Sequence, residues 1–230
     1  MPMDSRQAQR LRVIALFEDL GDAELARIAQ ACVTRTYERH AQIAADHEHV
    51  TDVFFVLDGT VRVNSMSPEG REVIFSDVGP GAIVGEFAAI DHQPRSAAMV
   101  AATDCVLARM PADKFDALLR SNSTVALRLI HLLVGKIRST SERVFEVSAL
   151  AVRERVRREL LRLAVTGTKA GKGVVIAPAP THYDLAARIG SHREAVTREL
   201  NRLAEENVLE IGRREIRILD LGLLQEEDEG

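Results

Sequence analysis

One stripe of residues, recurring at alternating steps of three and four between positions 127 and 151, constrains the fold of this chain more than any other feature. Such spacing follows one side of a long α-helix and is typical of a coiled-coil seam, most simply that of a parallel homodimer. A long helix packed inside a monomer is the alternative. A serine hydroxyl on a seam costs stability unless it has a partner, so we expect a polar group to be bound beside Ser141. The stripe consists of Leu127, Ile130, Val134, Ile137, Ser141, Val144, Ser148 and Ala151.

The chain before this stripe changes from helical to β-type patterning. Amphipathic spacing between Ser5 and Cys32 predicts short helices, and residues 33–110 then contain short apolar runs separated by turn signals. Runs that recur about every ten residues predict an antiparallel barrel or sandwich. The strand candidates are Asp52–Leu57, Thr60–Val63, Glu72–Phe75, Ser96–Val100 and Cys105–Met110, and the turns are Asp58-Gly59, Pro68-Glu69-Gly70 and Gly79-Pro80-Gly81.

The chain after the stripe predicts a helix-turn-helix with a hairpin behind it. Two short helices, Tyr183–Ile189 and Ser191–Glu206, are joined at Gly190, and a strand is predicted from Val174. Thr181 with Asp184 and Ser191 with Glu194 have the spacing of capping boxes. The hairpin runs through 208–211 and 215–219. On the second helix, Val196, Leu200 and Leu203 share the side expected to face the core, and the polar side chains left to project away are Arg193, Glu194, Thr197 and Arg198.

The net charge of −4 conceals an uneven distribution. Between Arg153 and Arg202 there are eleven Lys and Arg against five Asp and Glu, a local balance of +6, so the rest of the chain carries −10. A basic segment on an acidic body suggests that one part of the protein meets a polyanion. The alternative is an ordinary solvated surface.

Several classes of protein are excluded. No run reaches the roughly 18 apolar residues of a membrane helix, and the first ten residues lack the apolar core of a signal peptide. Two cysteines, Cys32 and Cys105, are too few for a disulfide-stapled scaffold or a four-cysteine metal site. We find no nucleophile–base pair and no metal-ligand cluster. The sequence therefore predicts a cytoplasmic protein that is not an enzyme, has no catalytic residues, and holds neither metal nor cofactor.

The segment Gly85-Glu86-Phe87-Ala88, followed by Arg95-Ser96-Ala97, has the chemistry to bind a phosphorylated ligand. A glycine permits close backbone approach, and free N–H groups beside it can hold an anion. Arg95 offers a planar fork suited to two phosphodiester oxygens, and Ser96 adds a hydroxyl. Glu86 can accept a hydrogen bond from a sugar hydroxyl. The alternative is an Arg95–Glu86 salt bridge at the mouth of a β-barrel.

This segment resembles the phosphate-binding cassette of cyclic-nucleotide-binding domains. The order of β-roll, long helix and winged helix-turn-helix is similar to that of the CRP/FNR family of bacterial transcription regulators, over nearly the whole chain. The resemblance implies that Glu86 accepts the ribose 2′-hydroxyl and that Arg95 and Ser96 hold the cyclic phosphate. Thr140 and Ser141 resemble the pair with which cAMP-responsive members contact adenine, Ser141 serving the partner subunit's ligand. They could instead be a solvated helix face.

The second of the two short helices, Ser191–Glu206, also resembles the helix with which members of the family read DNA, the recognition helix. Arginine pairs with guanine O6 and N7 in the major groove, and glutamate accepts from cytosine N4. The resemblance implies that Arg193, Glu194 and Arg198 read a TGTGA-like half-site in palindromic double-stranded DNA, and that RNA polymerase is a partner. Glu194 could also bond Ser191 or Arg198 in the free protein. The predicted DNA contacts are Thr181, Ser191, His192, Arg193, Glu194, Thr197 and Arg198, and the predicted dimer seam is Leu127, Ile130, Val134, Ile137, Ser141 and Val144.

We therefore expect an α+β fold in four parts. An antiparallel β-roll with N-terminal helices spans residues 1–120, and a long dimerisation helix with the hinge spans 121–152. A winged helix-turn-helix spans 153–224 and an acidic tail 225–230. The expected function is that of a homodimeric, allosteric transcription regulator that responds to cAMP. A response to cGMP, DNA binding independent of ligand, and a cyclic-nucleotide-binding regulatory subunit of an enzyme are the alternatives.

Overall fold

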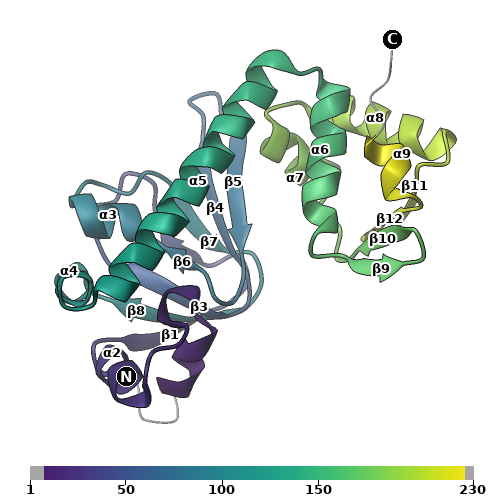
Figure 1. Cartoon of the computed structure of the whole chain (residues 1–230). Coiled ribbons are helices and arrows are strands. Elements are labelled where there is room, and N and C mark those ends of the chain that lie inside the picture. Colours follow the sequence, from purple (N-terminus) through teal and green to yellow (C-terminus); the bar gives the residue numbers. More distant parts are fainter. Residues whose placement is uncertain (1–7, 226–230) are drawn as a thin grey trace. The chain divides into compact units, whose positions relative to one another are not determined.

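The chain forms two compact units that meet in the sequence between Lys136 and Ile137. The computed structural model describes residues 8–225, so the tail predicted at 225–230 lies outside it apart from Gln225. Each unit has its own apolar core. The expected α+β class, with a β-roll, a long helix and a winged helix-turn-helix, is confirmed (Figure 1).

The first unit is built on two four-stranded antiparallel sheets. One sheet has the order β1-β8-β3-β6 and the other the order β2-β7-β4-β5. The strands are β1 (Val33–Tyr37), β2 (Gln42–Ala44), β3 (Val53–Asp58), β4 (Val61–Met66), β5 (Glu72–Val78), β6 (Ile83–Val84), β7 (Ala98–Ala101) and β8 (Cys105–Met110). Its helical segments are η1 (Gln9–Val13), η2 (Ala15–Phe17), α2 (Asp22–Gln30), α3 (Glu86–Asp91), α4 (Ala112–Ser121) and the first half of α5 (Ser123–Ala149).

Strand β3 is buried on both faces, which explains why its sequence is continuously apolar. Phe55 packs with Phe17 and Phe115 in a core that the helical segments cover, with the Phe17 and Phe55 rings 4.8 Å apart. Phe54 and Val56 belong to a second core, which includes residues of both sheets. Alternate side chains of one strand therefore serve two separate apolar clusters, as the two-residue period of a strand requires.

The second unit combines four helices and the end of α5 with a small sheet of order β11-β12-β10-β9. Its core joins one face of each helix to the sheet, with Leu160, Val196 and Ile218 among the fully buried residues. The elements are the end of α5, α6 (Val152–Ala164), β9 (Thr168–Ala170), β10 (Gly173–Ile176), α7 (His182–Ile189), α8 (Arg193–Glu205), β11 (Leu209–Gly212), β12 (Glu215–Ile218) and α9 (Leu221–Gln225).

Buried ion pairs connect the last turns of α5 to α6 and α7 within this unit. Glu146 of α5 accepts two hydrogen bonds from Arg162 of α6, at 2.8 and 2.9 Å. Glu159 of α6, which is 1% exposed, also pairs with Arg162 at 2.8 Å and with Arg188 of α7 at 3.5 Å. Desolvation of these carboxylates is offset only while the arginines stay in place. The cluster therefore fixes how three helices meet.

Two predicted helix starts have different outcomes. The capping box at Thr181 is confirmed, because its hydroxyl accepts from the Asp184 amide at 3.0 Å and Asp184 bonds back to the Thr181 amide. The capping box predicted at Ser191 is wrong. Helix α8 begins at Arg193 with His192 at the N-cap position, and Ser191 is buried, its amide bonded to the Ala186 carbonyl. The Gly190 turn thus continues two residues further than the spacing indicated.

Within the described part of the chain, no helix combines the length and apolar character needed to cross a lipid bilayer.

Replacing Glu159 by glutamine should lower the free energy of unfolding by about 3 kcal/mol, because partly buried arginines, Arg162 and Arg188 among them, lose the negative charge of their partner. The matched control is Asp116→Asn, which removes the exposed pair with Arg120 and should cost less than about 0.5 kcal/mol. Urea unfolding followed by circular dichroism measures both. Equal effects of the two substitutions would contradict a structural role for the buried cluster.

Candidate ligand-binding cassette and nucleic-acid interface

The predicted cassette lies where β6 turns into α3. Gly85 has a φ of 81°, in the left-handed region that favours glycine. A Cβ atom at this position would lie 2.5 Å from Nη1 of Arg95 and 2.9 Å from the Asp52 carbonyl. The glycine is therefore required both by its backbone conformation and by the close approach of Arg95.

Arg95 is the buried cation of this site, with 2% of its surface exposed. Its Nη1 donates to the Gly85 carbonyl at 2.8 Å, its Nη2 donates to the Asp52 carbonyl, and its guanidinium lies over the Phe54 ring. Burial lowers the pKa of Arg95, and the charges of Asp52, Glu48 and Glu86 oppose that shift. Its Nε has no hydrogen-bond partner within the described residues. An anion would compensate this buried charge.

The backbone around Arg95 is fixed as firmly as its side chain. Its amide donates to the Glu48 carbonyl at 2.9 Å, and its carbonyl accepts from the His47 amide at 3.0 Å. Asp52 has two partners: its carboxylate pairs with Arg109 at 2.7 Å, and its main-chain carbonyl accepts from Arg95. The guanidinium is thus held by the Phe54 ring on β3, by the Gly85 carbonyl at the start of α3 and by the Asp52 carbonyl just before β3.

Glu86 is the buried anion of the site, and its partner was not predicted. Lys136 of α5 donates to Oε1 of Glu86 at 2.6 Å, and its ammonium also lies 5.7 Å from the centre of the Phe87 ring. Glu86 is 3% exposed. The alternative of an Arg95–Glu86 salt bridge is wrong, because within residues 8–225 Arg95 bonds backbone carbonyls and Glu86 bonds Lys136.

The remaining cassette residues divide between surface and interior. Ser96 and Phe87 are exposed, whereas Ala88 and Ala97 are buried. Gly85, Glu86, Arg95 and Ser96 thus gather at one place in the first unit, with charged groups of both signs. A sugar phosphate, which offers an anion and hydroxyl donors together, matches this set.

Thr140 and Ser141 belong to the second unit, on the exposed side of α5. The Ser141 hydroxyl donates to the Ile137 carbonyl at 3.0 Å, so this serine has a partner without any ligand. The apolar seam residues are strongly exposed in the single chain, from 43% for Val134 to 65% for Ile137. The exposed set is Leu127, Ile130, Val134, Ile137 and Val144.

Helix α8 presents the predicted polar face. Val196, Leu200 and Leu203 are fully buried, whereas Arg193, Glu194 and Arg198 are exposed. The Thr197 hydroxyl donates to the Arg193 carbonyl at 2.9 Å and also bonds Nδ1 of His182 at 2.8 Å. His182, which the sequence analysis missed, thereby connects α7 to the face of α8 that carries the arginines.

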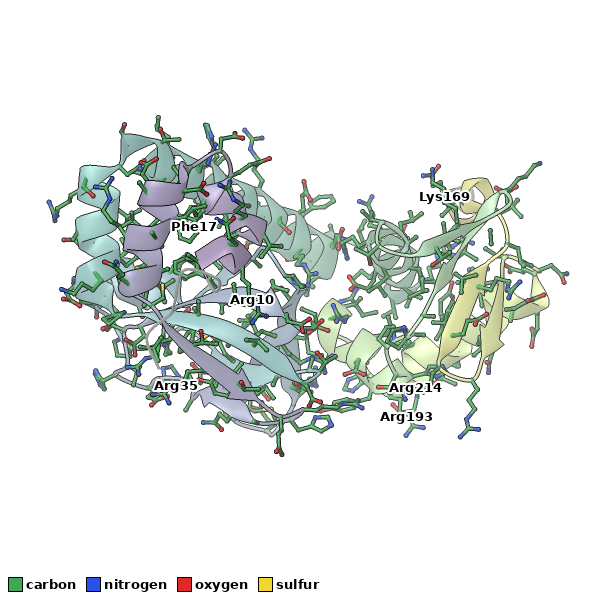
Figure 2. The ribbon with its side chains drawn as sticks, turned by 90° about the horizontal axis from the view of Figure 1, so that it is seen from below. Arg10, Phe17, Arg35, Lys169, Arg193 and Arg214 are labelled. Carbon is green, nitrogen blue, oxygen red and sulfur yellow. The ribbon has the colours of Figure 1, made fainter. Side chains whose placement is uncertain are left out.

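The hairpin turn after β11 adds cationic residues to the same unit. The Arg214 carbonyl accepts from the Ala179 amide at 2.8 Å, which places this turn beside the chain that leads into α7. In the view of Figure 2, Arg193 and Arg214 lie at one edge of the unit and Lys169 lies at the opposite edge. The positive charges at the first edge suit a polyanion.

Comparisons with known proteins agree with this arrangement. Residues 34–122 match the cyclic nucleotide-binding domain, and residues 154–227 match the Crp-like helix-turn-helix domain. The chain is 30% identical to the cyclic AMP receptor protein of Thermus thermophilus over 211 residues, which cover 92% of this chain and 95% of that protein.

Solved structures show the same fold. A CRP/FNR-family transcriptional regulator from Thermus thermophilus is 29% identical, with a TM-score of 0.68 over 84% of this chain and 96% of that one. The c-di-GMP responsive regulator CLP from Xanthomonas campestris is 20% identical, with a TM-score of 0.75 over 86% of this chain and 99% of that one.

Replacing Gly85 by alanine should lower the free energy of unfolding by more than about 2 kcal/mol, because the new Cβ meets Arg95 and a backbone carbonyl. Gly70→Ala is the control, since Gly70 has a φ of +78° but nothing within 4 Å of its added Cβ. The control should cost about 1 kcal/mol. Chemical denaturation measures both, and equal costs would contradict the close approach at Gly85.

Proposed function

The chain belongs to the CRP/FNR family of transcription regulators, and on that premise we propose that it is a homodimer whose binding to specific DNA sites is controlled by a cyclic nucleotide, most simply cAMP. It is a DNA-binding regulator with a cyclic-nucleotide-binding domain. Its relatives are named as transcription regulators and not as enzymes. The proposal requires no metal or other cofactor and assigns the protein to the cytoplasm.

Arg95 is the observation that carries the ligand proposal. A guanidinium that is 2% exposed and bonded to neutral carbonyls gains most from a bound anion. In the proposed complex Arg95 and Ser96 hold the cyclic phosphate beside Gly85. Lys136 occupies Oε1 of Glu86, and Oε2 is then the atom that accepts the ribose 2′-hydroxyl.

The assignment of the base rests on the family resemblance. Thr140 and Ser141 contact adenine in the proposed complex, Ser141 from the second subunit. The Ser141 hydroxyl can exchange its bond to the Ile137 carbonyl for one to the base, or accept from the base while keeping it. A cGMP response is the alternative, since the exposed Ser96 hydroxyl could meet a guanine amino group.

The exposed apolar stripe of α5 supports the homodimer. Leu127, Ile130, Val134, Ile137 and Val144 lie at coiled-coil spacing and are each 43–65% exposed in the single chain, which is typical of a surface that another chain covers. A second copy of the helix covers them. A two-fold dimer then presents two recognition helices about 34 Å apart, one for each half of a palindromic site.

The exposed side chains of α8 support sequence-specific binding. Arg193 and Arg198 suit guanine and Glu194 suits cytosine, so the proposed half-site is G·C-containing and TGTGA-like. The Thr197 hydroxyl donates a hydrogen bond to the Arg193 carbonyl, and while it does so it can offer DNA only an acceptor or its methyl group. Thr181, Ser191 and His192 are proposed phosphate contacts, and RNA polymerase is the proposed partner at the promoter.

Titration calorimetry of the full chain with cAMP and cGMP, with and without a palindromic TGTGA-type duplex, tests the proposal. We expect cAMP to bind and to strengthen duplex binding. Arg95→Ala should weaken cAMP binding by about ten- to a hundredfold, because a charge-assisted contact is lost. Because Arg95 also donates to two carbonyls, its removal could destabilise the domain. Arg95→Lys keeps the charge but loses the planar guanidinium, so it serves as the second variant.

Arg120→Ala, on an exposed turn of α4, is the matched control and should leave nucleotide binding unchanged. Unchanged cAMP binding by both Arg95 variants would refute the cassette assignment. Duplex binding that is indifferent to either nucleotide would leave a ligand-independent regulator.

Arg193→Ala should weaken binding to the matched duplex by about 1–3 kcal/mol and relax specificity at one base pair. Lys169→Ala, at the opposite edge of the unit in Figure 2, should change neither property. Fluorescence anisotropy with matched and single-mismatch duplexes at fixed salt measures both. Equal weakening by Arg193→Ala on all duplexes would show that Arg193 contacts only the backbone of the DNA.

A further inference from the structure

His182 connects the two helices of the helix-turn-helix through its side chain. It is the first residue of α7, and its Nδ1 lies 2.8 Å from the Thr197 hydroxyl on α8. Thr197 lies one turn after Arg193, among the residues that the proposed function assigns to DNA. The residue is only partly buried, so part of it remains accessible to a ligand.

The hydrogen bond from Thr197 to Arg193 favours one of the two neutral forms of the His182 imidazole. The Thr197 hydroxyl has a single hydrogen, which it donates to the Arg193 carbonyl at 2.9 Å. While it does so, the hydroxyl can only accept from His182, and the neutral ring then carries its proton on Nδ1. In the neutral ring Nε2 is then a bare acceptor, which repels phosphate oxygen. In the imidazolium Nε2 becomes a charged donor, which binds phosphate.

The free protein disfavours the imidazolium. Partial burial lowers the pKa of His182, and the nearby charge of Arg193 lowers it further. Two carboxylates on the neighbouring helices are engaged elsewhere. Asp184 of α7 bonds Thr181, and Glu159 of α6 pairs with Arg188 at the far end of α7. On the hairpin side, the turn carries Arg213 and Arg214, and His192 and Glu194 flank Arg193 on α8.

We propose that His182 is a proton-linked DNA contact, so that binding of the duplex is accompanied by uptake of a proton at Nε2. The inference rests on the proposed DNA-binding function and adds a pH response to it. DNA phosphates supply the negative charge that the free unit lacks at this position, and they favour the imidazolium. The bond from Nδ1 to Thr197 is kept in both states, so protonation needs no rearrangement of the helices.

The direction of the pH effect follows from linkage. The pKa of His182 is lowered in the free protein and raised in the complex, so affinity is highest below the free-protein pKa and falls as pH rises through the pKa of the complex. One linked proton gives at most about a tenfold change in affinity per pH unit. We expect binding to tighten severalfold between about pH 8 and about pH 6 at constant salt.

Calorimetry of duplex binding in two buffers of different ionisation enthalpy counts the protons taken up. The full chain, saturated with cAMP, is titrated near pH 7 with the palindromic TGTGA-type duplex. His182→Asn is the variant, because its amide can replace Nδ1 as the donor to Thr197 but cannot titrate. His40→Asn is the matched control, since His40 is an exposed imidazole in a turn of the first unit, and its left-handed backbone, with a φ of 69°, also accepts asparagine.

The wild type and His40→Asn should take up a substantial fraction of a proton, and His182→Asn should take up clearly less while still binding the duplex. Uptake that persists in His182→Asn, or that disappears in His40→Asn instead, would overturn the proposal. Duplex binding without proton uptake by the wild type would overturn it too and leave the proposed function intact. Failure to bind the duplex at any pH would overturn both.

Discussion

Buried charges impose the strictest constraint on this fold, because a buried ion without a partner costs several kcal/mol. Glu86, Glu146 and Glu159, three buried carboxylates described above, each pair with a cation on another helix. Lys136 of α5 pairs with Glu86 of α3 in the first unit. In the second unit Arg162 of α6 pairs with Glu146 of α5. The charges therefore determine which helices can be neighbours, whereas the apolar cores determine only that they pack.

Arg95 differs from these pairs because it has no carboxylate bonded to it among the residues that the structure describes. It is bonded to carbonyl dipoles, and the shape of the site around it depends on Gly85, the one residue type that allows the guanidinium to approach so closely. A fold stabilised only by its own contacts would gain from an acidic partner here. The site is thus organised for a ligand more than for stability, which is the pattern expected of a functional site.

The sequence predicted the fold class and the elements of the candidate sites, because each depends on local pattern. The heptad stripe, the short strands between glycine turns and the buried side of α8 all follow from spacing within one element. The partners of the key side chains could not be read in this way. Lys136 reaches Glu86 across 50 residues and His182 reaches Thr197 across 15, so only the tertiary structure brings them together. The cap at Ser191 failed because the turn at Gly190 buries that residue.

The division of β3 between two cores has a consequence for how such a protein can change over generations. Phe55 faces the helices, whereas Phe54, its neighbour in sequence, faces the other way and lies beneath Arg95. Substitutions on the Arg95 side can alter what the site accepts while leaving the helix-covered core around Phe55 unchanged. One strand thereby carries, on opposite faces, side chains that can change when the protein evolves to recognise a new ligand and side chains that must be kept for the helices to pack.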